Sequence, residues 1–134
     1  MRFELLDSEM SLDESHLDID EDTLRAQLAA YGRGERREFD VPVSYPEGLV
    51  GDVMRLMAAI PYGQTRTYGD LAAELDSSAQ AVGQACGANP VPIVVPCHRV
   101  VAADGLGGFS AEGGTDLKRR LLALESGESL ARFV

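Results

Sequence analysis

The sequence predicts an α+β fold, within the broader α/β class, with a short sheet-containing N-terminal segment and a C-terminal winged-helix-like domain. Two observations predict it. The first part shows weak apolar–polar alternation and an extended, proline-containing stretch, and the second shows closely spaced helical periodicities. We place the boundary near residue 44, which gives segments 1–44 and 45–134. The 134 residues, 45% of them hydrophobic, suffice for a packed core.

The first segment begins with the acidic residues 1–22, for which we predict an early strand followed by a flexible loop. A short helix then begins, with Asp20 or Asp22 as its cap, and glycines end it. Its apolar residues fall near one face: Leu24, Leu28 and Tyr31. The stretch REFDVPVSYP, residues 37–46, alternates apolar and polar residues and predicts an extended linker or an edge strand.

Three helices are predicted next. Apolar residues at helical spacing predict the first, before the turn at residues 61–63: Leu49, Val53, Leu56, Met57 and Ile60. A second begins after Thr67, which with Asp70 forms a near capping box. A third, AQAVGQACGAN at residues 79–89, follows a serine cap and carries no charge, so it can pack closely on its neighbours or enter a groove. Helix, short turn, helix is a layout that reads DNA.

The apolar run at residues 91–95 predicts a strand that Pro96 ends or bulges, because proline cannot donate a strand hydrogen bond. Beyond it, the glycine-rich stretch ADGLGGFSAEGG predicts a loop that can approach a ligand closely. The final stretch, TDLKRRLLALESGE, predicts a helix capped by Thr115 or Asp116.

The formal net charge is −10, and Lys118 is the single lysine among twelve basic residues, a composition that resembles proteins from salt-loving organisms. Such acidity normally counts against a nucleic-acid partner. It is concentrated at the start, however, since residues 1–40 hold twelve acidic residues and five arginines. No stretch of about 18 apolar residues and no secretion signal is present, so we expect a cytoplasmic protein. Two cysteines cannot build a zinc cluster, and we expect no metal and no cofactor.

Cys97 stands between Pro96 and His98 at the end of the apolar run. A free cysteine is often an inert, buried hydrophobe. Alternatively, His98 and Arg99 supply the polar and cationic surroundings that lower the pKa of a thiol and make it reactive. The residues alone leave both interpretations open. Cys86, on the uncharged helix, is interpreted as a packing residue, and we expect no resolving cysteine beside Cys97.

Three stretches together resemble the active domain of O6-alkylguanine-DNA alkyltransferases, over roughly residues 45–127. They are IPYGQTRTYGDLAA, GANPVPIVVPCHRVV, and GLGGFS followed by a helix with LKRRLLALE. The resemblance implies direct-reversal DNA repair, in which an alkyl group, such as methyl, moves irreversibly from O6 of guanine in double-stranded DNA to Cys97. It implies single turnover, no cofactor, and a monomer.

The resemblance also implies roles for individual residues. His98 acts through a water molecule as the base for Cys97, and Glu125 on the last helix orients the imidazole. Tyr68 donates a proton towards guanine N3 and helps to rotate the nucleotide. Asn89 bridges the helix pair to the cysteine turn, because its amide can donate and accept at once.

Further residues are implied in substrate and DNA binding. The carbonyls of Cys97 and Val100 take the exocyclic amine of guanine, Ser110 contacts its oxygen, and Phe109 stacks on the extruded base. The residues expected to contact DNA are Ser78, Gln80, Ala81 and Arg99. Gln80 stands where many family members carry an arginine that fills the space left by the rotated nucleotide.

Three other functions fit parts of the sequence. A relative that binds the lesion without transferring the group would share the short N-terminal segment, but such relatives typically replace the cysteine that is present here. A winged-helix transcription regulator would account for the helix pair alone and leave PCHRV and GGFS without explanation. A thiol hydrolase would need an oxyanion site that nothing in the sequence suggests.

Overall fold

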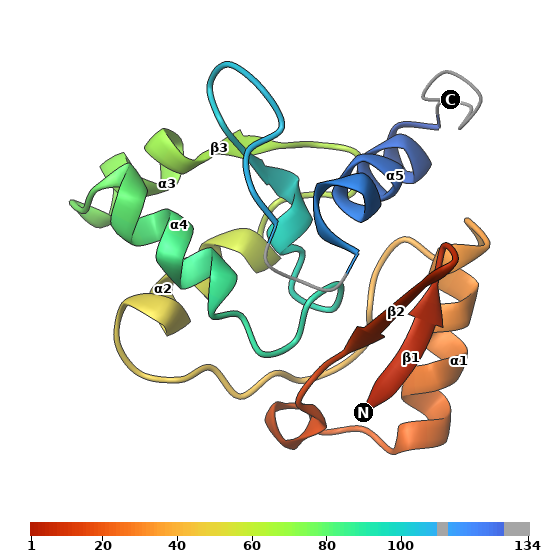
Figure 1. The fold of residues 1–134 in the computed structure, drawn as a ribbon. Coiled ribbons are helices and arrows are strands. Elements are labelled where there is room, and N and C mark those ends of the chain that lie inside the picture. The colour runs from red at the N-terminus through yellow and green to blue at the C-terminus, as the bar shows by residue number, and fades with distance from the viewer. Residues whose placement is uncertain (110–112, 128–134) are drawn as a thin grey trace.

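In the computed structural model, which describes residues 1–109 and 113–127, an N-terminal hairpin and helix lie beside a mostly helical C-terminal part (Figure 1). The elements are β1 (Arg2–Leu5), β2 (Ser8–Ser11), the 3-10 helix η1 (Glu14–His16), α1 (Glu21–Gly32), α2 (Leu49–Ala58), β3 (Arg66–Thr67), α3 (Tyr68–Leu75), α4 (Ala79–Gly87), the 3-10 helix η2 (Cys97–Arg99), β4 (Val100–Val101) and α5 (Gly114–Ser126). The predicted α+β class is confirmed.

The N-terminal strands β1 and β2 form an antiparallel hairpin in which Leu5 pairs with Ser8. Leu6 and Asp7 both take positive φ, 49° and 65°, the conformation that matches a two-residue turn to the twist of its strands. The early strand confirms the prediction. The prediction of a loop after it is wrong for residues 8–11, which form β2. In that strand only Met10 is buried, so its alternation is too short to stand out in the sequence.

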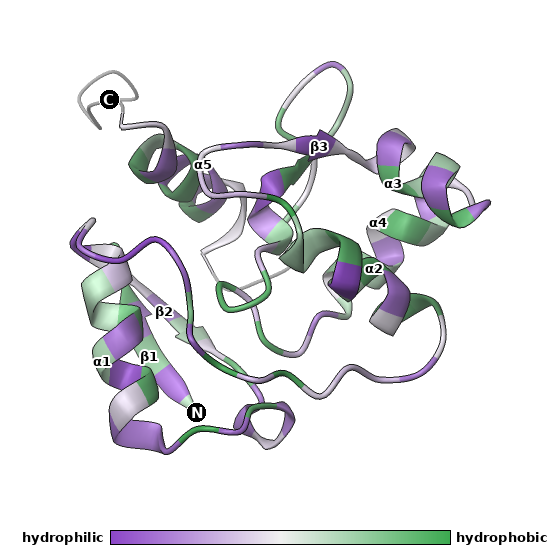
Figure 2. Cartoon of the chain, turned by 180° about the vertical axis from the view of Figure 1, so that it is seen from behind, coloured by the Kyte–Doolittle hydropathy of each residue, from purple (hydrophilic) through white to green (hydrophobic). Residues whose placement is uncertain are grey.

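Helix α1 covers this hairpin. Asp20 is its cap, accepting the backbone N–H of Thr23 at 2.9 Å. The predicted apolar face is confirmed, since its buried residues are Leu24, Leu28 and Tyr31. Hydrophilic and hydrophobic residues both occur along α1 (Figure 2), as expected of a helix with one buried face.

The segment between α1 and α2 runs back across the N-terminal unit. As predicted, its middle is extended, and Val43 forms an isolated antiparallel bridge with Leu17. The backbone N–H of Ser44 donates to the carbonyl of His16 at 2.7 Å. At its end, a Cβ on Gly51 would lie 1.7 Å from the carbonyl oxygen of Pro46, so only glycine allows the linker to meet the start of α2.

Helices α2, α3 and α4 confirm the three predicted helices and pack on one another. Thr67 caps α3 in a full capping box, because its hydroxyl accepts the N–H of Asp70 and the Asp70 carboxylate accepts the N–H of Thr67, both at 3.0 Å. Ser78 caps α4. The small residues of α4 allow a close approach to its neighbours, and its buried side chains are Val82, Ala85 and Cys86.

The strand predicted at residues 91–95 is wrong. The chain makes a turn there, in which the N–H of Val95 donates to the carbonyl of Val91 at 3.0 Å and Ile93 takes a φ of 76°. Pro92 and Pro96 remove two of the donors that a strand would need. The regular pairing lies further on, where β4 joins β3 in parallel and connects the cysteine turn to the start of α3.

The predicted final helix is present as α5, but the predicted caps Thr115 and Asp116 are wrong. Gly113 is the capping residue, with a φ of 91° and no side-chain hydrogen bond, because two glycines with positive φ complete the turn before Thr115. The buried residues of α5 are Leu117, Lys118, Leu121, Ala123 and Glu125. No helix among residues 1–109 and 113–127 is long and apolar enough to span a membrane.

Replacing the cap of α3 should destabilise the fold. We expect Thr67→Ala to lower the free energy of unfolding by about 1 kcal/mol, because it leaves an N-terminal N–H of the helix without its acceptor. Urea denaturation measures this loss. The exposed Thr65→Ala, two residues earlier, is the control and should leave the midpoint unchanged. Equal midpoints for both variants would contradict the capping assignment.

Candidate active site

The turn before β4 presents Cys97. Pro96 begins η2, the N–H of Cys97 donates to the carbonyl of Val95 at 2.8 Å, and the N–H of Arg99 donates to the carbonyl of Pro96 at 3.0 Å. These bonds bring three successive side chains into different surroundings. Cys97 is 8% exposed and lines a cavity, whereas His98 is fully buried.

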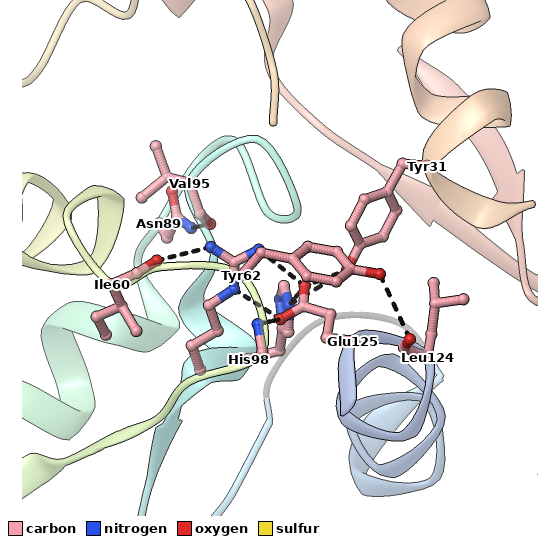
Figure 3. Close-up of polar contacts among 10 residues, drawn as sticks. Tyr31, Ile60, Tyr62, Asn89, Val95, His98, Leu124 and Glu125 are labelled. Atoms are coloured by element: carbon pink, nitrogen blue, oxygen red, sulfur yellow. Dashed lines mark hydrogen bonds and ion pairs between the residues drawn. The ribbon is translucent and has the colours of Figure 1, made fainter. Parts of the chain in front are cut away.

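Three polar side chains meet at the carboxylate of Glu125 (Figure 3). His98 Nε2 lies 2.7 Å from Oε2. Arg99 donates from Nε to Oε1 at 2.7 Å and from its second terminal nitrogen to Oε2 at 2.9 Å. Tyr31, which reaches in from α1, donates its hydroxyl to Oε2 at 2.5 Å. Because an ionised carboxylate only accepts, Nε2 is the protonated nitrogen of His98.

This network determines the protonation of its members. Burial alone would raise the pKa of Glu125, but hydrogen bonds from His98 and Arg99 outweigh it and lower the pKa to about 2. Burial also lowers the pKa of His98 against the opposing hydrogen bond to Glu125, so its imidazole is neutral at pH 7. Among the described residues, no group hydrogen-bonds to His98 Nδ1, which is buried. The ring therefore has a basic nitrogen available at Nδ1.

Asn89 fixes the cysteine turn to the end of α4. Its Nδ2 donates to the carbonyl of Val95 at 2.9 Å, and its Oδ1 accepts the N–H of Val91 at 3.1 Å. Burial raises the pKa of the Cys97 thiol, whereas a hydrogen bond from Asn89 and the positive charge of Lys118 lower it. The resting side chain is therefore a thiol that needs a base before it can attack.

The cavity has a volume of about 470 Å³ and opens in front of Cys97. Its lining residues are Tyr68, Gln80, Gly83, Gln84, Cys86, Gly87, Cys97, Gly108 and Phe109. Positions 80, 83, 84 and 87 share one face of α4, and the glycines among them keep that wall open. The cavity is large enough to take a small molecular group and to bring it against the buried thiol.

Lys118 contacts two residues of the cavity wall, Tyr68 and Gly108. Its Nζ is fully buried and donates to the carbonyls of Val100 at 2.7 Å and Gly108 at 2.9 Å. The hydroxyl of Tyr68 lies 3.4 Å from Nζ. Burial raises the pKa of Tyr68, so the phenol keeps its proton. A Cβ on Gly107, which has a φ of 76°, would lie 2.8 Å from the Tyr68 ring, so glycine lets the loop pack against it.

The chain is similar to known proteins over most of its length. Residues 50–127 match the family model described as 6-O-methylguanine DNA methyltransferase, DNA binding domain. A Methanopyrus kandleri relative named methylated-DNA–protein-cysteine methyltransferase is 48% identical over 105 residues, which cover 77% of this chain and 79% of that protein. The chain belongs to the O6-methylguanine DNA methyltransferase family.

Other members of the family are similar to the chain in sequence and in structure. A Mycolicibacterium paratuberculosis protein of the same name is 47% identical over 109 residues, and the match covers 78% of this chain and 65% of the relative. The crystal structure of the Mycobacterium tuberculosis O6-methylguanine methyltransferase superposes with a TM-score of 0.71 at 41% identity, covering 84% of this chain and 72% of that one. The same organism's OGT in complex with DNA gives 0.72 at 43% identity, covering 79% and 67%.

Among the residues expected from the family resemblance, the structure brings together Cys97, His98, Glu125, Tyr68 and Asn89 around the thiol and its cavity. Phe109 is half-buried and lines the cavity. Val100 is fully buried, and its carbonyl already accepts the Lys118 ammonium. Ser110 lies outside the described residues.

The expected DNA contacts divide into two groups. Gln80 is exposed on α4 and lines the cavity, whereas Ala81 is half-buried. Ser78 is exposed and its hydroxyl accepts the N–H of Ala81 at 3.1 Å, which makes it the cap of α4. Arg99 is placed differently from expectation. It is 7% exposed and its guanidinium is engaged by Glu125 and the carbonyl of Ile60, so it is not available to DNA.

Sequence reasoning missed three members of this site. The first is Lys118, which lies seven residues before the predicted Glu125 on the same buried face of α5. A lysine among the apolar residues of that face was the available signal. Cys86, interpreted as a packing residue, is buried and also lines the same cavity as Cys97. Burial raises the pKa of Cys86 to about 12, so it remains a thiol. Tyr31 was assigned to packing alone.

In the part of the chain that the structure describes, no three His, Cys, Asp or Glu side chains are grouped so that they could hold a metal ion.

Acid should destabilise this protein through the buried pair. The folded-state pKa of Glu125, about 2, is below its ordinary value of 4.5, so its ionisation stabilises the fold above about pH 4.5 and this contribution disappears as the pH falls to about 2. The loss is on the order of 3 kcal/mol. The pKa of His98 is also lowered, so this residue likewise reduces the stability of the fold as the pH falls below about 6.5.

Urea denaturation as a function of pH measures this dependence. Glu125→Gln cannot ionise, so the slope of its unfolding free energy below pH 4.5 should be clearly smaller than that of the wild type. The same slope in both proteins would contradict the ionised, buried carboxylate.

Proposed function

We propose that this chain repairs alkylated DNA by transferring an alkyl group, such as methyl, from O6 of guanine to Sγ of Cys97, once per molecule. The observation that carries the proposal is a buried thiol at the wall of a cavity of about 470 Å³, directly followed in the chain by a histidine held by a buried carboxylate. The family membership and the names of the relatives support the same reaction.

The nucleophile is formed when the Cys97 thiol loses its proton to Nδ1 of His98 through a water molecule. Glu125 holds the opposite nitrogen of the ring and stabilises the imidazolium that forms. The thiolate sulfur then attacks the alkyl carbon, so that a carbon–sulfur bond forms while the carbon–O6 bond breaks. The resulting thioether is stable, which makes the reaction a single turnover.

The leaving guanine takes the electron pair of the broken bond. Tyr68 keeps its proton at neutral pH and donates it towards guanine N3, and the ammonium of Lys118, 3.4 Å from the hydroxyl, stabilises the oxygen that remains. The imidazolium of His98 finally releases its proton to solvent, which in turn reprotonates Tyr68. In total, the thiol proton has been exchanged for the alkyl group.

Access to Cys97 requires base extrusion. The thiol is 8% exposed at the wall of the cavity, so a guanine stacked in duplex DNA cannot reach it and the nucleotide has to rotate out. In this proposal α4 enters the groove as in a winged-helix protein. It is uncharged and lined with small residues, and Gln80 occupies the space that the base leaves.

The reaction should be stoichiometric. With duplex DNA that contains O6-methylguanine, we expect one methyl group per protein molecule, on Cys97. Because no lysine or arginine lies between Arg66 and Arg99, trypsin leaves both cysteines in one peptide, and fragmentation has to assign the methyl group. Cys97→Ala should abolish transfer, whereas Cys86→Ala keeps the acceptor and should still yield one methyl group. Repeated turnover, or methyl on Cys86, would contradict the proposal.

Gln80 should matter only when a base has to be extruded. Extrusion costs a few kcal/mol, and an inserted planar amide offsets part of that cost. We expect Gln80→Ala to slow repair of duplex DNA roughly tenfold, which corresponds to about 1.4 kcal/mol, and Gln80→Arg to speed it. Free benzylguanine is the control substrate, since it needs no extrusion and should react at nearly unchanged rates.

Single-turnover rates with both substrates decide this point. Equal changes on the free base and on the duplex would show that Gln80 acts on the cavity or the fold, and its role in extrusion would have to be abandoned.

A further inference from the structure

Tyr31 is a feature that the proposed reaction has not used. It lies on α1, outside the residues 50–127 that match the family model, yet its hydroxyl ends inside the buried network on α5 (Figure 3). The side chain is fully buried. Its hydroxyl donates to Glu125 Oε2 at 2.5 Å and lies 3.4 Å from His98 Nε2.

We propose that Tyr31 is a positioning residue that, through its hydrogen bond to Glu125, keeps His98 neutral and able to act as the base for Cys97. The proposal rests on the proposed function and adds a role for the N-terminal unit. Helix α1 would then contribute a polar group to the site, in addition to the apolar surface by which it packs on the hairpin.

The phenol of Tyr31 has a single proton to donate. At 2.5 Å from an ionised carboxylate, that proton lies towards Glu125, because a charge-assisted hydrogen bond is stronger than one to a neutral ring at 3.4 Å. Tyr31 therefore cannot donate to Nε2 of His98. Nε2 must carry its own proton to meet Oε2, and the lone pair of the neutral ring is left on Nδ1.

A second effect concerns the basicity of the ring. Glu125 raises the pKa of His98, whereas Arg99 on η2 and Lys118 on α5 lower it, and burial lowers it most. By donating to Oε2, Tyr31 withdraws negative charge that would otherwise act on the imidazole. The hydroxyl therefore helps to keep His98 neutral, and only the neutral ring can accept the thiol proton.

Tyr31→Phe tests this role because it removes the hydroxyl and keeps the ring. The matched control is Tyr62→Phe, since Tyr62 packs edge-on against Tyr31 with ring centroids 6.2 Å apart. Tyr62 faces the same carboxylate but donates its hydroxyl to the carbonyl of Leu124 at 3.4 Å. If the two hydroxyls served only to pack and hydrogen-bond within the fold, both variants would be affected alike.

The first readout is the rate of transfer from free benzylguanine to Cys97 between pH 5 and 9, which does not involve DNA. We expect the acidic limb of the profile to move up by about one pH unit in Tyr31→Phe and to stay in place in Tyr62→Phe. On that limb the variant should react up to about tenfold more slowly, since one unit of pKa changes the neutral fraction tenfold.

The second readout is nitrogen NMR of the imidazole rings, which is simple because the chain has two histidines, His16 and His98. The wild type should show neutral His98 protonated at Nε2, and Tyr31→Phe should titrate at higher pH. The Nδ1-protonated tautomer in the wild type would overturn the proposal, even if the variant failed to fold. So would an unshifted titration in Tyr31→Phe, or an equal shift in Tyr62→Phe.

These outcomes are separable from the proposed function. If the wild-type protein transfers no alkyl group, the repair reaction is wrong, while the NMR measurement still decides whether Tyr31 controls the protonation of His98. If the wild type transfers the group and the pH profile of Tyr31→Phe is unchanged, only the role of Tyr31 is wrong.

Discussion

The buried carboxylate of Glu125 is the constraint on which the rest of the structure depends. A negative charge removed from water is tolerated only when donors surround it, and removing one donor is costly. Here the donors come from distant parts of the chain, namely Tyr31 on α1 and His98 and Arg99 on η2. The hydrogen bonds to this one carboxylate therefore join the N-terminal unit, the cysteine turn and the last helix.

A buried cation, Lys118, lies on the same helix as Glu125. Lys118, two turns before Glu125 on α5, is held by the carbonyls of Val100 and Gly108. Its positive charge lowers the pKa of the Cys97 thiol and that of His98, whereas Glu125 raises the pKa of His98. Beside the larger effect of burial, two charged side chains of α5 therefore act on the site, Lys118 on both the thiol and His98, and Glu125 on His98.

The composition of α4 fits this arrangement. Its caps and small residues allow it to pack against α2 and α3, and the glycines on its outer face leave a cavity in front of the thiol. Bulkier side chains at positions 83 and 87 would fill the space that a flat base needs. The same absence of bulk brings the Cys86 thiol to the cavity wall, where burial keeps it protonated.

The sequence by itself determined the local features, because these depend on neighbouring residues. Helical spacing and caps predicted α1 to α4, and PCHRV with the matching stretches predicted the thiol, its base and the family. Tertiary structure decided what depends on distant contacts. Residues 91–95 form a turn, and Arg99 is buried and bonded to Glu125. Tyr31 donates a hydrogen bond to Glu125, which lies 94 residues later in the chain. Neither periodicity nor spacing contains such pairings, since they arise only when buried charges find their partners during packing.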